Sequence, residues 1–295
     1  MALLGVTLHL DYAPPLDWAF FLGYFSGRLT TGVETVESGH YTRAVEIDGD
    51  TGTITVAPHA SQHQLSVSVR GPVARHTDAI RARVRQMFDL DADPAAVRVA
   101  LATEPRMSAL VAARPGIRVP GAWSHFELLV RTIVGQQVSV RAATTIMGRI
   151  ATRFGHRMSN SDSAPPDLLF PAPEVLADGD LSSIGMPTQR VRALRAVARA
   201  VADRALVFTD PDQNAVRATL LALPGIGPWT VEYFALRGLR DSDAWPGSDL
   251  VLKRAVESPI TEAWRPYRGY AAQHLWLDAT QRAAPRRTST PQNGS

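Results

Sequence analysis

The first ninety residues alternate between apolar and polar positions with the period of a β-strand. Four segments share this alternation: residues 6–10, 41–47, 53–56 and 65–69. Between two of them, the sequence Asp48-Gly49-Asp50-Thr51-Gly52 is typical of a β-hairpin turn. An aromatic-rich segment over residues 16–29 and an arginine-rich segment over residues 73–88 predict two helices. We therefore expect residues 1–88 to form an α/β domain built on an antiparallel sheet.

After Asp93-Pro94 the alternation ends, and apolar residues recur every three or four positions, as in amphipathic helices. Ten segments share this spacing: residues 95–102, 106–113, 123–135, 138–154, 173–179, 188–204, 212–222, 228–238, 249–257 and 266–280. Two loops interrupt them, over residues 114–121 and over the proline-rich stretch 155–173. Residues 283–295 lack any apolar pattern and are expected to form a disordered tail.

Composition narrows the class of protein. Hydrophobic residues make up 45% of the 295 positions and charged residues 20%, as in ordinary globular proteins. No apolar run is long enough to span a membrane, and the N-terminus lacks the features of a signal peptide. We therefore expect a cytoplasmic protein that is associated with the nucleoid. The absence of cysteine excludes disulfides, thiol nucleophiles, cysteine-bound zinc and iron–sulfur clusters.

The cations are almost all arginine, since Lys253 is the only lysine. The net charge is only +3, but the sequence pI is about 9.6. Arginine binds phosphate through two parallel hydrogen bonds and stacks on bases, which suits a nucleic-acid partner. A genome that favours arginine codons would give the same composition. Composition alone therefore leaves nucleic-acid binding open.

A glycine-rich turn joins two of the predicted helices. The sequence over residues 223–230 reads Leu-Pro-Gly-Ile-Gly-Pro-Trp-Thr, with Pro228 at the first position of the second helix. Gly225 and Gly227 allow left-handed backbone angles and the close approach of another backbone. The free N–H groups of the second helix would then face outward and could bind a phosphate. The alternative is a plain helical hairpin with a glycine turn.

An acidic residue follows this hairpin. Gly247-Ser248-Asp249 precedes an apolar segment, so Ser248 or Asp249 occupies the N-cap position of a helix. Asp249 could be a catalytic carboxylate. It could equally be a helix cap paired with Lys253 one turn later, an ordinary arrangement on helices. Spacing alone does not separate these two interpretations.

The whole pattern resembles the DNA-3-methyladenine glycosylase II family of the helix-hairpin-helix DNA glycosylase superfamily. The agreement runs in order along the chain, over residues 17–18, 22–24, 32–37, 113–116, 119–121, 133–140, 181–187, 223–230, 233–238, 247–253, 264–268 and 274–276. The resemblance implies an α+β fold, in which an antiparallel-sheet domain precedes an all-α core of two helical lobes. It predicts a sheet domain over residues 1–88 and a lobe with the catalytic aspartate over 89–112 and 231–282. A lobe with the hairpin covers 113–230, and the tail covers 283–295.

The resemblance also assigns site residues. Asp249 is the expected catalytic carboxylate, and the expected base pocket comprises Trp229, Tyr233, Trp276 and Tyr24. The DNA-binding residues it implies are Gln137, which would fill the gap left by an extruded base, with Gly225, Gly227 and Thr230 of the hairpin. Relatives often hold a monovalent cation on hairpin carbonyls, which here belong to Leu221, Leu223 and Ile226. No other cofactor is expected.

The implied function is monofunctional base excision from double-stranded DNA that contains damaged bases. An alkylated purine is already cationic and leaves without being protonated, so one carboxylate can suffice. Bifunctional glycosylase-lyases use a hairpin lysine, and this chain has Trp229 at the matching position. Leu250 and Leu277 stand where family members look aromatic, so the range of bases stays open. A glycosylase-lyase and a non-catalytic DNA-binding module are the alternatives, and we expect a monomer without membrane contact.

Overall fold

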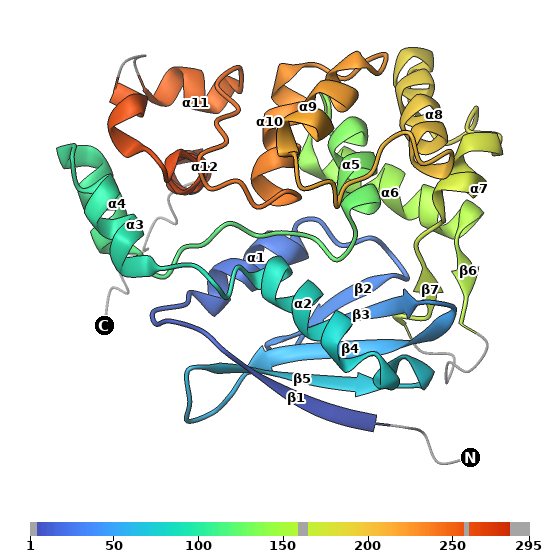
Figure 1. Cartoon of the computed structure of the whole chain (residues 1–295), viewed down its shortest axis with the longest axis horizontal. Coiled ribbons are helices and arrows are strands. Elements are labelled where there is room, and N and C mark those ends of the chain that lie inside the picture. The colour runs from blue at the N-terminus through green and yellow to red at the C-terminus, as the bar shows by residue number, and fades with distance from the viewer. Residues whose placement is uncertain (1–4, 159–164, 257–259, 284–295) are drawn as a thin grey trace, which may run out of the picture.

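The computed structural model describes residues 5–158, 165–256 and 260–283 of the chain. It has the expected α+β fold (Figure 1). A sheet forms one side of the molecule, helices α1 and α2 lie along one face of it, and the other helices lie beyond them. Most of the predicted tail, residues 284–295, lies outside the described residues.

The N-terminal domain contains five antiparallel strands in the order β1-β5-β4-β3-β2. The strands are β1 (Gly5–Asp11), β2 (Glu34–Glu37), β3 (His40–Ile47), β4 (Asp50–Pro58) and β5 (Gln64–Arg70). The predicted hairpin turn joins β3 to β4, with Asp48 and Gly49 at φ 51° and 82°. Alternate strand residues such as Leu65, Val67 and Val69 are fully buried. They pack against α1 (Trp18–Ser26) and α2 (Thr77–Phe88).

Two features of this domain differ from the sequence prediction. Strand β2 was not predicted, because its buried residue is Glu34, which accepts hydrogen bonds from the Tyr41 hydroxyl (2.5 Å) and the Thr30 amide (3.0 Å). The helix predicted over residues 73–88 is divided. A short 3-10 helix, η1, spans Pro72–Arg75, and α2 begins at Thr77. His76 lies between the two helices and caps both of them.

The rest of the chain is mainly helical. The bounds of its α-helices lie within three residues of the predicted ones, whereas the short 3-10 helix η2 was not predicted. These helices are α3 (Pro94–Leu101), α4 (Pro105–Ala113), α5 (His125–Val134), α6 (Val140–Phe154), α7 (Pro173–Asp178), α8 (Thr188–Ala202), α9 (Gln213–Ala222), α10 (Pro228–Arg237), α11 (Leu250–Ala255), η2 (Ile260–Trp264) and α12 (Arg268–Ala283). Helices α3, α4, α11 and α12 pack as one group, and α5 to α10 pack as another (Figure 1). No helix in the described part of the chain is long and apolar enough to cross a membrane.

The prediction of a loop over residues 155–173 was wrong for part of this segment. Strands β6 (His156–Arg157) and β7 (Leu168–Leu169) pair antiparallel there. Leu168 and Leu169 are buried, and the amide of Leu168 donates to the carbonyl of Gly32 in the sheet domain (2.9 Å). A strand of two residues is too short to show the alternation of apolar and polar residues by which strands are recognised in a sequence. Contacts with the N-terminal domain determine their structure.

A buried ion pair links the sheet domain to the helices. The Arg43 guanidinium of β3 donates to the Glu127 carboxylate of α5 at 2.8 Å, and both side chains are less than one-tenth exposed. The carboxylate keeps the buried Arg43 charged despite the cost of desolvation. The two parts of the chain are therefore joined by complementary charge as well as by apolar packing.

Candidate active site

The predicted hairpin is formed by α9, the turn over residues 223–227, and α10. Gly225 has a φ of 77°, and a β-carbon there would lie 2.7 Å from the β-carbon of Ala193 in α8. Gly227 has an ordinary extended φ of −106°, and a β-carbon there would meet nothing within 4 Å. Only Gly225 thus needs the left-handed freedom that was expected of both glycines. No side chain caps α10 at Gly227, so its first N–H groups remain available to an anion.

The loop before α6 is tied to this hairpin. The side-chain amide of Gln136 donates to the Gly225 carbonyl (3.2 Å) and to the Thr230 hydroxyl (3.0 Å). Gln137 is exposed, and its backbone φ is 56°, a value that residues other than glycine seldom adopt. Gln136 therefore fixes the loop, while the neighbouring Gln137 projects freely. Sequence reasoning assigned a role to Gln137 alone and did not predict the tie made by Gln136.

Asp249 is the N-cap of α11, as expected. One carboxylate oxygen, Oδ1, accepts from the backbone N–H groups of Val251 (2.9 Å) and Leu252 (3.2 Å). Two indoles also donate to the carboxylate: Trp276 to Oδ1 at 3.1 Å and Trp229 to Oδ2 at 3.2 Å. Asp249 is partly buried. The two interpretations of this residue are compatible, since the cap holds a carboxylate that borders the aromatic cluster.

The four predicted pocket aromatics come together. The rings of Trp229 and Tyr233 stack with centroids 5.1 Å apart, and the Tyr233 and Trp276 centroids are 5.9 Å apart. Tyr24 reaches the cluster from α1 of the sheet domain, where it faces the same guanidinium as Tyr233 and Trp276. Residues from α1, α10 and α12 thus form one aromatic cluster next to Asp249.

That guanidinium belongs to Arg237, which the sequence analysis did not single out. Its central carbon lies 4.8 Å from the ring centroids of both Tyr24 and Tyr233, and 5.4 Å from that of Trp276. It donates to the Pro120 carbonyl and the Gln273 side chain, each at 2.9 Å, and is only 3% exposed. Within the described residues no carboxylate pairs with it. Its spacing of four residues from Tyr233 was the available signal.

Arg237 lowers the pKa of both buried tyrosines, against the effect of burial. Burial raises the pKa of Tyr24, but the positive charges of Arg237 and Arg28 outweigh it and hold that pKa below its ordinary value. Burial raises the pKa of Tyr233, and Arg237 offsets this only in part. The guanidinium also occupies one side of the ring cluster, so a ligand must use the remaining ring faces.

Other candidate residues are less central. Lys253 is exposed one turn after Asp249, and no ion pair joins them in the part of the chain that is described. His125 lies against the Gly238 carbonyl (3.0 Å), and His274 is 4% exposed, which agrees with structural roles. Among the described residues no cluster of histidine and acidic side chains could hold a metal ion.

Two family models match the sequence. The one described as the AlkA N-terminal domain covers residues 7–124, and the one described as "HhH-GPD superfamily base excision DNA repair protein" covers residues 130–267. The chain is 35% identical over 278 residues to DNA-3-methyladenine glycosylase 2 of Escherichia coli, covering 90% of this chain and 95% of that protein. It is 36% identical to the probable bifunctional transcriptional activator/DNA repair enzyme AlkA of Mycobacterium tuberculosis, covering 92% of this chain but 56% of that protein.

Solved structures share the fold. A 3-methyladenine DNA-glycosylase from Archaeoglobus fulgidus superposes with a TM-score of 0.77 at 18% identity, covering 92% of this chain and 97% of that one. A Clostridium acetobutylicum 8-oxoguanine glycosylase/lyase in complex with double-stranded DNA gives 0.63 at 14% identity, covering 86% and 99%. At these identities the likeness establishes the architecture. The site must be judged from its own residues.

Proposed function

This chain belongs to the DNA-3-methyladenine glycosylase 2 family of HhH-GPD base excision repair proteins, and from that premise we propose that Asp249 is its catalytic carboxylate. The chain is a DNA glycosylase for alkylated bases. The observation that carries the proposal for Asp249 is the convergence of two indole N–H groups on one fixed carboxylate, beside an aromatic cluster.

The reaction needs a negative charge near the sugar. When the bond between C1′ and the base nitrogen breaks, its electron pair goes to the cationic base, which leaves neutral. The sugar then develops oxocarbenium character, and a fixed carboxylate stabilises that charge more than it stabilises the substrate. A water oxygen bonds to C1′, and one of its protons passes to Asp249. The four hydrogen bonds to this carboxylate hold it in place.

The base must leave the duplex to reach Asp249. We assign the flipped base to the aromatic cluster of Trp229, Tyr233, Trp276 and Tyr24, where π-faces attract an electron-poor ring. Gln137 is exposed and projects from a loop that Gln136 ties to the hairpin, which suits a side chain that fills the vacated gap.

The hairpin is assigned to a DNA phosphate, bound by the first N–H groups of α10 near Gly227 and Thr230. The carbonyls of Leu221, Leu223 and Ile226 would hold a monovalent cation, whose charge would favour the phosphate. Neutral carbonyl oxygens from one turn suit such an ion, although the Leu223 carbonyl also accepts the Ile226 N–H at 3.2 Å. Because one chain supplies all these groups, we propose that it acts as a monomer on double-stranded DNA with damaged bases.

The alternative of a bifunctional glycosylase-lyase lacks its nucleophile. Trp229 occupies the hairpin position, and its indole donates to Asp249. Borohydride should therefore trap no covalent complex on abasic DNA. A trapped complex that disappears in Lys253→Ala would support the lyase instead.

The decisive experiment measures base release from methylated DNA by Asp249→Asn. Asparagine also caps helices well, so α11 should persist while the negative charge is lost. Asp93→Asn is the matched control, because Asp93 caps α3 through two backbone N–H groups in the same way. We expect Asp249→Asn to lose at least about a thousandfold in single-turnover rate, with DNA binding kept and Asp93→Asn unaffected. If Asp249→Asn released the base at the wild-type rate, Asp249 would be a helix cap and not the catalytic carboxylate.

A further inference from the structure

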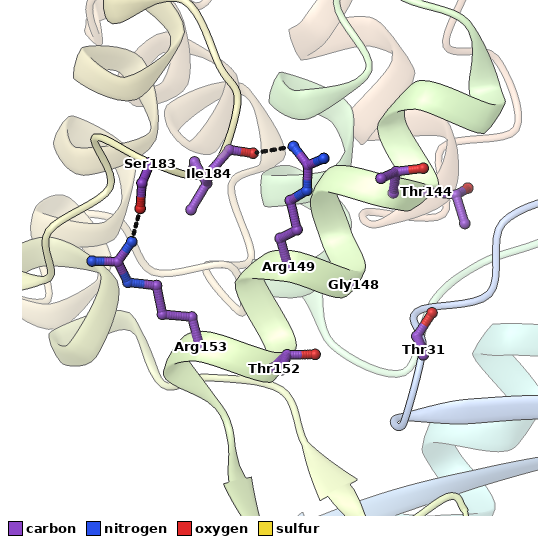
Figure 2. A pocket seen from close by; sticks show the side chains of 9 residues that line it. Thr31, Thr144, Gly148, Arg149, Thr152, Arg153, Ser183 and Ile184 are labelled. Carbon is purple, nitrogen blue, oxygen red and sulfur yellow. Dashed lines mark hydrogen bonds between the residues drawn. The ribbon is translucent and has the colours of Figure 1, made fainter.

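An open groove lies beside α6 (Figure 2), and its lining includes none of the four aromatic residues of the candidate active site. Its volume is about 540 Å³, and Gly148 of α6 lies at its floor. The turn between α7 and α8, with Ser183 and Ile184, forms one wall, and Thr31 of the sheet domain forms the other. Nothing in the reaction described above uses this groove.

Two arginines of α6 point toward the α7–α8 turn (Figure 2). Arg149 donates to the Ile184 carbonyl at 3.3 Å, and Arg153 donates to the Ser183 hydroxyl and to Asp180 (3.2 Å). A guanidinium has five N–H donors, so these bonds orient both side chains and leave most donors unused. Within the described residues Arg149 forms no ion pair, so its charge is not neutralised by a neighbour.

The other groups around the groove are hydroxyls. Thr31, Thr144, Thr145, Thr152 and Ser183 line it, and among the residues that the structure describes no acidic one does. Guanidinium and hydroxyl donors are the side chains that contact phosphate and sugar in DNA complexes. The turn also leaves room for Arg149, because a β-carbon on Gly185, at a φ of 85°, would lie 2.5 Å from its Nη1 atom.

The groove is connected through α6 and α8 to the elements assigned to DNA. Helix α6 starts at Val140, three residues after Gln137, and α8 packs beneath the hairpin turn through Ala193 and Gly225. From Val140 to Arg149 the helix rises about 14 Å, which is the length of about four base pairs. A duplex opened at Gln137 could therefore extend along α6 to the groove.

We propose that this groove binds a backbone phosphate of the duplex about four nucleotides from the damaged base, with Arg149 as its principal ligand. Arg153 and the hydroxyls complete the site. The proposal rests on the proposed function, since it takes the DNA to be held at the hairpin and at Gln137. It adds a second anchoring point that fixes the direction of the duplex across the protein.

The first test measures binding to undamaged duplex over a series of salt concentrations. Loss of one phosphate contact should lower the slope of log K against log salt by about 0.9 in Arg149→Ala. Arg149→Lys should restore most of the slope. Arg199→Ala is the matched control, because it removes the same charge from α8 outside the groove, where Arg199 pairs with Asp178. Equal slopes for wild type and Arg149→Ala would overturn the proposal.

The second test locates the phosphate. Single neutral methylphosphonates are placed at each position within about six nucleotides of the lesion on either strand. One position should weaken wild-type binding several-fold and leave Arg149→Ala unchanged. Additive losses at every position would overturn the proposal. So would millimolar binding of inorganic phosphate that Arg149→Ala abolishes while duplex binding is unaltered, because that result indicates a free-anion site.

These outcomes are independent of the catalytic assignment. Asp249→Asn tests base release, whereas the groove is tested through binding of undamaged DNA. If Asp249→Asn kept its activity, the proposal for the groove would be unaffected. If wild type and Arg149→Ala had equal salt slopes, the assignment of Asp249 would be unaffected.

Discussion

The carboxylate of Asp249 shows how one residue can serve structure and chemistry. Capping of α11 fixes its backbone and orients its side chain, and the indoles of Trp229 and Trp276 then donate to its two oxygens. Each donor helps to hold the carboxylate in one position. Asp249 could be named from the sequence only through family resemblance, because a capping aspartate has the same spacing. Its indole partners were assigned to the base pocket, and their bonds to the carboxylate became visible only in the structure.

We predict that Trp276→Phe lowers the single-turnover rate of base release about tenfold. Phenylalanine keeps an aromatic face for the base but removes the N–H that donates to Asp249, and a hydrogen bond to a charged group contributes about 1.5–3 kcal/mol. Trp18→Phe is the control, because the Trp18 indole donates to the Gly39 carbonyl in the sheet domain at 2.8 Å. An unchanged rate in Trp276→Phe would mean that the indole N–H does not orient the carboxylate.

Whole elements were predicted well where local sequence determines them. Most of the predicted helices have an apolar face and begin at a capping residue such as Asp93, Ser124 or Asp212. Elements that depend on distant contacts were missed. Strand β2 buries a glutamate, and β6 and β7 are two residues long. Arg237 was missed for the same reason, since its role depends on Tyr24 from another domain.

The two hairpin glycines should respond differently to substitution. Gly225→Val should destabilise the protein by about 2 kcal/mol or more, because its φ of 77° and the nearby Ala193 leave no room for a side chain. Gly227→Val should fold normally but bind all DNA sequences several-fold more weakly, since its side chain would stand before the N–H groups of α10. Thermal unfolding and duplex binding separate the two effects. If Gly227→Val bound DNA as tightly as wild type does, the hairpin would not be part of the DNA interface.

The loop before α6 gives a second prediction at this scale. Gln137→Ala should reduce base release from duplex about tenfold or more and barely change release from single-stranded DNA. The hole left by a flipped base exists only in a duplex, where unstacking costs about a few kcal/mol. The ratio of single-turnover rates on the two substrates is the measurement. An equal loss on both would place Gln137 in the pocket or the fold.

At the scale of the molecule, the site exists only because the sheet domain and the helices are joined. Tyr24 comes from α1 and Asp249 from the start of α11, and Arg237 faces the Tyr24 ring with its charge unpaired among the described residues. The buried pair Arg43–Glu127 and the contact of β7 with Gly32 hold the two parts together. The α+β order of domains followed from hydrophobic patterning. The contacts between the domains could not be predicted in this way. They depend on buried polar groups, and hydrophobic patterning predicts that polar groups lie on the surface.

Global stability should depend on pH through the buried histidines. Burial lowers the pKa of His274 to about 4, with a further contribution from Arg114, and burial also lowers the pKa of His125. Between the ordinary value near 6.5 and about 4, the unfolded chain binds a proton that the folded chain does not. The free energy of unfolding should therefore fall as pH is lowered through this range, by up to about 1.4 kcal/mol per pH unit for His274, and His125 contributes in the same direction.

Chemical denaturation at several pH values between 7 and 4.5 measures this dependence. In His274→Gln the slope of unfolding free energy against pH should be smaller than in wild type, because the group that gains a proton on unfolding is gone. His63→Gln is the control, since the His63 side chain is exposed to solvent in the folded protein as it is in the unfolded chain. His274→Gln will cost some packing at every pH, so the slope and not the absolute stability is the test. Parallel curves for wild type and His274→Gln would show that His274 takes up no extra proton on unfolding and that acid sensitivity arises elsewhere.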